Sequence, residues 1–139
     1  MTNCRHIVFQ LVLCTAVSLS WAQTNLQSKD GYVRSEGNAW ILGTSLVEKR
    51  VRLSNGRFAQ ISLRNKVSGR EYQDGNNPPD EIRFLVNGHD IVASNWRWAF
   101  RSEHASQFAQ GELQLDVELS SAGLRVSKHY VVYPGTAVI

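Results

Sequence analysis

The chain has 139 residues and a formal net charge of +3, from 15 Lys and Arg against 12 Asp and Glu. This length supports one domain core and no more. The small net charge, with no run of Lys or Arg in the sequence, argues against a nucleic-acid-binding protein.

Residues 1–22 have the three parts of a secretory signal peptide. Arg5 is the only charged side chain, an apolar run extends from Ile7 to Val17, and small residues lead to a cleavage site after Ala22. The apolar run is shorter than the roughly 20 residues that cross a bilayer, and no long apolar segment follows it. The sequence therefore predicts a secreted or periplasmic protein with no membrane anchor after cleavage.

Residues 23–37, the first of the expected mature chain, are polar and weakly patterned, which predicts a flexible lead-in. Cys4 and Cys14 both belong to the signal peptide, so the mature chain would contain no thiol. The domain, expected over residues 38–139, would then depend on its apolar core rather than on disulfides.

Strand patterns follow the lead-in and are separated by turn sequences. The pairs Asn55-Gly56 and Asn87-Gly88 are strong hairpin signals. The strands expected around the first pair cover residues 46–53 and 57–65, and those around the second cover 82–86 and 89–92. Between the two hairpins, residues 69–80 contain Gly, Asp, Asn and two consecutive prolines, which predicts an exposed loop.

Alternation of apolar and polar residues is clearest in the last third of the chain. Residues 113–119 have an apolar side chain at every odd position, which predicts a half-buried strand. A turn at 120–123 and a second strand at 124–133 complete an antiparallel hairpin, and 96–101 is a further strand candidate. With no convincing helical repeat anywhere, the predicted fold class is all-β, an antiparallel β-sandwich.

The C-terminal residues suggest that the sandwich is incomplete. Pro134-Gly135 predicts a turn, and residues 136–139 begin another β-type run. A short apolar run of this kind, with no partner after it, would leave an unpaired strand edge.

The sequence gives little evidence for a nucleophilic active site or a metal site. The G-x-S-x-G motif is absent, and the His residues have no recognisable partner pattern. His89-Asp90 and Glu103-His104 are adjacent pairs, and adjacent side chains in a strand point to opposite faces. We therefore expect no catalytic triad, no metal site and no cofactor.

Carboxylates are available for glycoside hydrolysis but are not visibly arranged for it. Asp80-Glu81 is one cluster, and Glu71 lies near Asp74. Hydrolysis requires two carboxyl groups on either side of the scissile bond, and nothing in the sequence brings two of them across a cleft. No catalytic residue is expected.

Aromatic residues offer a candidate binding surface. Trp96, Trp98 and Phe100 alternate on one face of the 96–101 strand, with residues 97, 99 and 101 on the other. The row could stack on the apolar faces of a sugar, which makes Trp96 and Trp98 the candidate carbohydrate-binding residues. It could equally form the bulky part of the core. Trp40, beside Ile41 and Leu42, is expected in the core.

Several strings together indicate a family. They include WILG at 40–43, LSNGRF at 53–58, LRNKVSGREY at 63–72, GEL at 111–113 and KHYVVYPGTAVI at 128–139. This series resembles the N-terminal β-supersandwich domain of α-galactosidase-like enzymes, glycoside hydrolase family 36 and its relatives, over most of residues 38–139. The resemblance implies a galactose-mutarotase-like supersandwich, incomplete at its C-terminus.

In that family the supersandwich precedes a (β/α)₈ barrel that carries two catalytic aspartates. None of the barrel is present in this chain, so no catalytic residue carries over to any position. The resemblance implies a part in processing galactoside-containing carbohydrates, with the catalytic barrel as the missing partner. Two alternatives remain open, a free-standing secreted carbohydrate-binding module and a structural β-domain that docks a partner through an open sheet edge.

Overall fold

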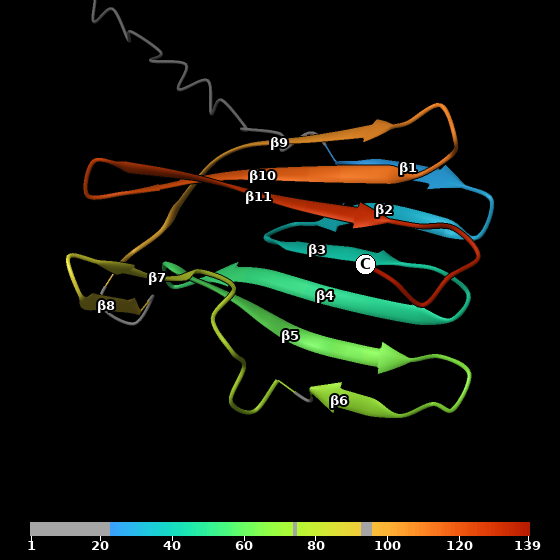
Figure 1. The fold of residues 1–139 in the computed structure, drawn as a ribbon, viewed down its shortest axis with the longest axis horizontal. Coiled ribbons are helices and arrows are strands. Elements are labelled where there is room, and N and C mark those ends of the chain that lie inside the picture. Colours follow the sequence, from blue (N-terminus) through green and yellow to red (C-terminus); the bar gives the residue numbers. More distant parts are fainter. Residues whose placement is uncertain (1–22, 74, 93–95) are drawn as a thin grey trace, which may run out of the picture.

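A computed structural model describes residues 23–73, 75–92 and 96–139, and the predicted signal peptide at 1–22 lies outside them. The described residues form strands and no helix, so the all-β prediction is confirmed. The strands build a six-stranded sheet, a three-stranded sheet and a two-stranded hairpin, all antiparallel, in a sandwich-like arrangement (Figure 1).

The six-stranded sheet contains, in spatial order, β1 (Asn25–Ser28), β2 (Gly31–Glu36), β3 (Ala39–Gly43), β4 (Val47–Ser54), β5 (Arg57–Asn65) and β6 (Glu71–Gln73). The three-stranded sheet has the order β11 (Leu124–Val132), β10 (Leu113–Ser121) and β9 (Ala99–Gln107). The separate hairpin is β7 (Arg83–Val86) with β8 (His89–Val92).

Both Asn-Gly pairs form the tight turns that the sequence predicts. Asn55 and Gly56 have φ angles of 52° and 76°, and Asn87 and Gly88 have φ angles of 50° and 77°. Two consecutive residues with positive φ match the twist of the strands that they connect. The hairpins β4–β5 and β7–β8 follow from this geometry.

The segment expected to be a flexible lead-in is instead ordered as β1 and β2, so that prediction is wrong. Val33 is fully buried and Ser35 is 4% exposed, whereas Tyr32, Arg34 and Glu36 are on the outer face. Ser35 N also donates a hydrogen bond of 2.8 Å to Thr24 O. Because Gly31 and Ser35 occupy two of the three inward positions of β2, the alternation shows little hydrophobic contrast in the sequence.

The core lies between the inner faces of the two larger sheets. The odd-numbered residues of β10 from Leu113 to Leu119 are fully buried, which confirms the alternation predicted for this strand. Across from them the larger sheet contributes Trp40 and Leu42, also fully buried. The remaining buried members of this cluster are Val33, Val51, Phe58, Ile82, Trp98, Tyr130 and Val132.

The predicted loop at residues 69–80 follows the edge of the large sheet for part of its length. Its residues Glu71–Gln73 pair with β5 as β6. Farther along, Gln60 N donates to Pro79 O (3.1 Å) and Glu81 N donates to Phe58 O (3.0 Å). Two stretches of this connection therefore run beside β5.

The last residues form a turn and a short tail rather than the strand expected at 136–139. Thr44 Oγ1 donates to Thr136 O (2.8 Å), and Gly135 N donates to Asp30 Oδ1 (2.7 Å). Ile139 packs against the core, whereas Val138 is 56% exposed. The tail is fixed by these side chains and not by strand pairing.

Candidate functional site

The structure places the two predicted carbohydrate-binding tryptophans mainly in the core. Trp98 is 3% exposed, and Trp96 is partly buried against the core cluster. Their rings stack with centroids 6.1 Å apart. Arg97 and Ala99 are exposed, so the predicted alternation holds, although the strand begins only at Ala99. Of the two tryptophans, Trp96 is the one that retains exposed surface.

Glu81 lies in a cluster of polar side chains between the two sheets. Its carboxylate is 2.9 Å from Lys49 Nζ and 3.5 Å from Lys128 Nζ, and it accepts a hydrogen bond of 2.7 Å from the Tyr130 hydroxyl. Burial works to raise the pKa of Glu81, but Lys49, Tyr130 and Lys128 outweigh burial and hold the pKa below its ordinary value. The ionised carboxylate joins β4 to β11 and is not suited to act as a general acid.

The neighbouring acidic residues are also engaged in structural contacts. Asp80 Oδ1 pairs with Arg57 Nε at 2.5 Å. Glu103 Oε2 accepts a hydrogen bond of 2.5 Å from Trp40 Nε1, and its other oxygen accepts one from the Thr24 hydroxyl. These carboxylates connect strands of opposite sheets or anchor the 79–81 segment. Among them no pair is arranged across a cleft.

One pairing was not found in the sequence. Asp116 on β10 lies opposite His129 on β11 and His104 on β9, and His129 Nδ1 is 2.7 Å from Asp116 Oδ1. The signal was available, because the alternation of β10 places Asp116 on the outer face. His129 can be identified as the partner of Asp116 only from the register between β10 and β11, which could not be read from the sequence. In the described part of the chain no three His, Cys, Asp or Glu side chains are placed to hold a metal ion.

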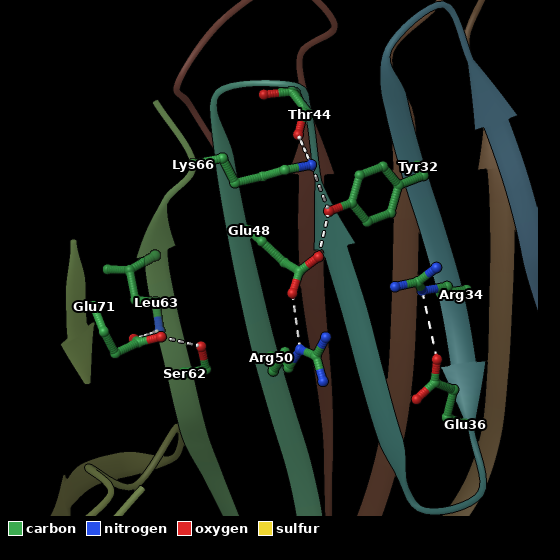
Figure 2. Close-up of polar contacts among 10 residues, drawn as sticks. All are labelled: Tyr32, Arg34, Glu36, Thr44, Glu48, Arg50, Ser62, Leu63, Lys66 and Glu71. Atoms are coloured by element: carbon green, nitrogen blue, oxygen red, sulfur yellow. Dashed lines mark hydrogen bonds and ion pairs between the residues drawn. The ribbon is translucent and has the colours of Figure 1, made fainter. Parts of the chain in front are cut away.

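A network of charged residues covers the outer face of the six-stranded sheet (Figure 2). The Tyr32 side chain extends from β2 across Gly43 of β3, and its hydroxyl donates to Glu48 Oε2 on β4 (2.6 Å). Glu48 Oε1 accepts a hydrogen bond of 2.8 Å from Arg50 Nε, and Lys66 Nζ donates to Thr44 O at 2.9 Å.

These contacts shift the pKa values of the two central groups. Burial, followed by the hydrogen bond to Glu48, raises the pKa of Tyr32 above its ordinary value. For Glu48, burial acts to raise the pKa, but hydrogen bonds from Tyr32 and Arg50 outweigh it and lower the pKa. The donors and acceptors of this network are hydrogen-bonded to one another. The network therefore links β2 to β4 across β3 and is not a site of proton transfer.

The strongest candidate for a functional surface is the side of the sandwich bordered by β11. In Figure 1 the three-stranded sheet overlies β1 and β2, whereas β4, β5 and β6 extend past β11. Leu63 on β5 and Tyr72 on β6 lie on this extension, together with Val47 of β4. With Ala137 and Ile139 of the tail they line a cavity of about 420 Å³. We call this surface the open side.

Two features of the open side favour binding of a further polypeptide segment. β11 is the last strand of its sheet and pairs only with β10 among the described strands, so its second edge has backbone groups available for pairing. The adjoining cavity is lined largely by apolar atoms, and Tyr72 is 56% exposed. A strand added to β11 would lie over this apolar surface.

Comparisons of the chain with protein-family models, curated proteins and solved structures give no match. Within the described ranges, no helix of sufficient length and apolar character to cross a membrane occurs.

Proposed function

We propose that this chain is the N-terminal β-sandwich of a secreted or periplasmic α-galactosidase-like glycoside hydrolase. In this proposal the chain is an accessory domain that positions a catalytic barrel and has no catalytic residues of its own. The observation that carries the proposal is the unequal width of the two sheets, which leaves the open side next to the free edge of β11.

Strand addition at the open side would satisfy two requirements together. The backbone of an added strand would pair with the free edge of β11, as in β-augmentation. Its inward side chains would cover Leu63 and Tyr72, which a complete sandwich would bury. A supersandwich with additional strands has this arrangement, which supports the family resemblance.

The strings behind the resemblance also occupy positions with clear structural roles. WILG at 40–43 is most of β3, whose Trp40 and Leu42 are fully buried. In the NKVSGRE string at 65–71, Asn65 Oδ1 accepts hydrogen bonds from Val67 N (3.0 Å) and Ser68 N (2.9 Å), which forms the turn before β6. Such positions suit a domain that supports catalysis elsewhere.

A reconstitution experiment tests the proposal. The purified chain would be mixed with the catalytic barrel of an α-galactosidase from which the N-terminal sandwich has been removed. We expect no hydrolysis of p-nitrophenyl α-galactoside by the chain alone. We expect the mixture to show a higher barrel melting temperature and more hydrolysis than the barrel alone.

Two matched variants make the test specific. Leu63→Glu puts a charge into the open side and should abolish the gain, whereas Leu85→Glu, at a position on β7 that is 69% exposed, should retain it. Turnover by the chain itself, or an equal gain with both variants, would contradict the proposal.

A further inference from the structure

A second cavity, of about 530 Å³, lies on the opposite face of the three-stranded sheet from the core. Gln114 and Val131, which are register partners on β10 and β11, form its floor. Phe108 and Tyr133 contribute aromatic walls and are 47% and 42% exposed. The polar rim includes Gln110 and Glu112. We call this cavity the hairpin cleft, because the β9–β10 turn forms one side of it.

Both aromatic residues are attached to turns that are held in place by hydrogen bonds. On one side, Phe108 N donates to Glu112 O (2.8 Å) and Gly111 N donates to Phe108 O (2.9 Å). On the other side, Tyr133 O accepts hydrogen bonds from Thr136 N (3.2 Å) and Thr136 Oγ1 (2.8 Å). The two rings are therefore attached to backbone that is already ordered. Ligand binding would then cost less conformational entropy than binding to mobile turns.

The polar groups of the cleft are partly oriented and partly available. Gln114 Nε2 donates to Asp116 Oδ1 (2.7 Å), and the same oxygen lies 2.7 Å from His129 Nδ1. This chain of contacts orients the Gln114 amide on the cleft floor. Within the described residues, the side chains of Gln110 and Glu112 have no hydrogen-bond partner in the protein. They can accept hydrogen bonds from a ligand.

The combination of groups defines the class of ligand. Exposed rings present apolar faces, and amide and carboxylate oxygens accept hydrogen bonds from hydroxyl groups. Glu112 is the only charged residue that lines the cleft, so an anionic ligand would be repelled. A neutral saccharide offers both apolar C–H faces and hydroxyl donors, and it lacks the unfavourable charge.

We infer that the hairpin cleft is a binding site for a neutral saccharide chain, with Phe108 and Tyr133 as the stacking residues. The inference deepens the proposed function and rests on it for the choice of α-galactoside probes. It replaces the sequence-based assignment to Trp96 and Trp98, because Trp98 is buried.

Affinity electrophoresis of the whole chain in gels that contain galactomannan tests this inference. We expect the unmodified protein to be retarded, and Phe108→Ala and Tyr133→Ala each to weaken binding by roughly tenfold or more, as for a central aromatic contact. Tyr72→Ala is the matched control, since Tyr72 is an exposed tyrosine on the other sheet. Its retardation should equal that of the unmodified protein.

A second set of measurements distinguishes loss of the binding site from misfolding of a variant. Glu112→Ala changes a partly exposed side chain and should weaken binding without lowering the melting temperature. Parallel gels with polygalacturonate distinguish a neutral from an acidic ligand. No retardation of the unmodified protein in galactomannan, stronger retardation in polygalacturonate, or loss of binding only with Trp96→Ala would overturn the inference.

The result is independent of barrel docking. The hairpin cleft and the open side share no lining residue. Saccharide binding that survives Leu63→Glu, together with lost reconstitution, would show that the two surfaces act separately. Failure of galactomannan binding would leave the reconstitution result unaffected.

Discussion

Gly43 is the residue that allows the Tyr32 side chain to lie across β3. A methyl group added at this position would lie 2.5 Å from Val47 O and 2.7 Å from the Tyr32 hydroxyl oxygen. The first of these contacts is with the backbone of β4, which cannot move as easily as a side chain. The space at Gly43 is therefore a requirement of the network in Figure 2.

We expect Gly43→Ala to lower the free energy of unfolding by about 2 kcal/mol, because overpacking of this kind typically costs about 1–3 kcal/mol. Urea unfolding of the variant and the unmodified protein measures the difference. Tyr32→Phe is the control, since it keeps the ring and removes only the hydroxyl that bonds to Glu48. If combining Tyr32→Ala with Gly43→Ala restores no stability, the Val47 carbonyl accounts for the whole cost.

Glu81 gives the stability of the protein a dependence on acid. Its pKa in the folded protein is below the ordinary value of 4.5, so its ionisation favours the folded state. This contribution is fully present above the pKa of the unfolded chain and is lost as the pH falls through the lower, folded pKa. The loss should therefore begin as the pH falls to the unfolded-chain pKa of about 4.3 and continue below it.

Glu81→Gln should remove this part of the acid dependence and should destabilise the protein at neutral pH. Breaking a fully buried ion pair costs about 3–5 kcal/mol, and we expect about 2 kcal/mol here because the Lys128 side chain is 32% exposed. Unfolding free energies measured from pH 7 down to pH 3 provide the check. An unchanged slope in the variant would assign the acid dependence to other carboxylates.

At the scale of elements, β1 and β2 are the part of the fold with the least sequence signal. We expect backbone amides of β2, including that of Ser35, which bonds to Thr24 O, to exchange slowly with deuterium. We also expect Val33→Ala to lower the unfolding free energy by about 2 kcal/mol, because Val33 is fully buried. Fast hydrogen exchange throughout residues 25–36 would instead support the sequence-based prediction that this segment is flexible.

The elements that could be predicted are those with strong local chemistry. The β10 strand has a Leu or Val at each inward position, and the two Asn-Gly pairs favour positive φ, so sequence alone located these hairpins. In β2 the inward positions include Gly31 and Ser35, and its turn from β1 uses Lys29 at φ 53° with no such signature. A strand could be predicted where its inward and outward residues differ strongly in hydrophobicity or where its turn has a characteristic sequence. Burial alone was not enough.

The surfaces were harder to predict than the strands. Trp96 and Trp98 attract attention because they lie on one face of an alternating segment, yet the same alternation directs Trp98 into the core. Phe108 and Tyr133 are far apart in the sequence and are brought together only by the pairing of β10 with β11. The hairpin cleft and the open side are products of register and sheet width, which no single segment encodes.

For the whole molecule, the open side predicts weak self-association. A free strand edge beside an apolar cavity can pair with a second copy when no other strand covers it. Sedimentation velocity should show an apparent mass that rises with protein concentration, and Leu63→Glu should reduce this rise while Leu85→Glu should not. A single monomer peak at all concentrations would indicate that the Lys128 side chain and the tail protect this edge.

The order of strands within each sheet has a consequence for how the protein folds. Neighbouring strands in the six-stranded sheet are consecutive in the chain, and the same is true of β9, β10 and β11. Each pairing therefore closes only a short loop, at a small cost in entropy. Because the wide sheet is complete by residue 73, a growing chain can form it before β9–β11 have been synthesised. Docking of the second sheet onto β1 and β2 joins segments distant in sequence, so we expect this docking to be the slow step in forming the sandwich.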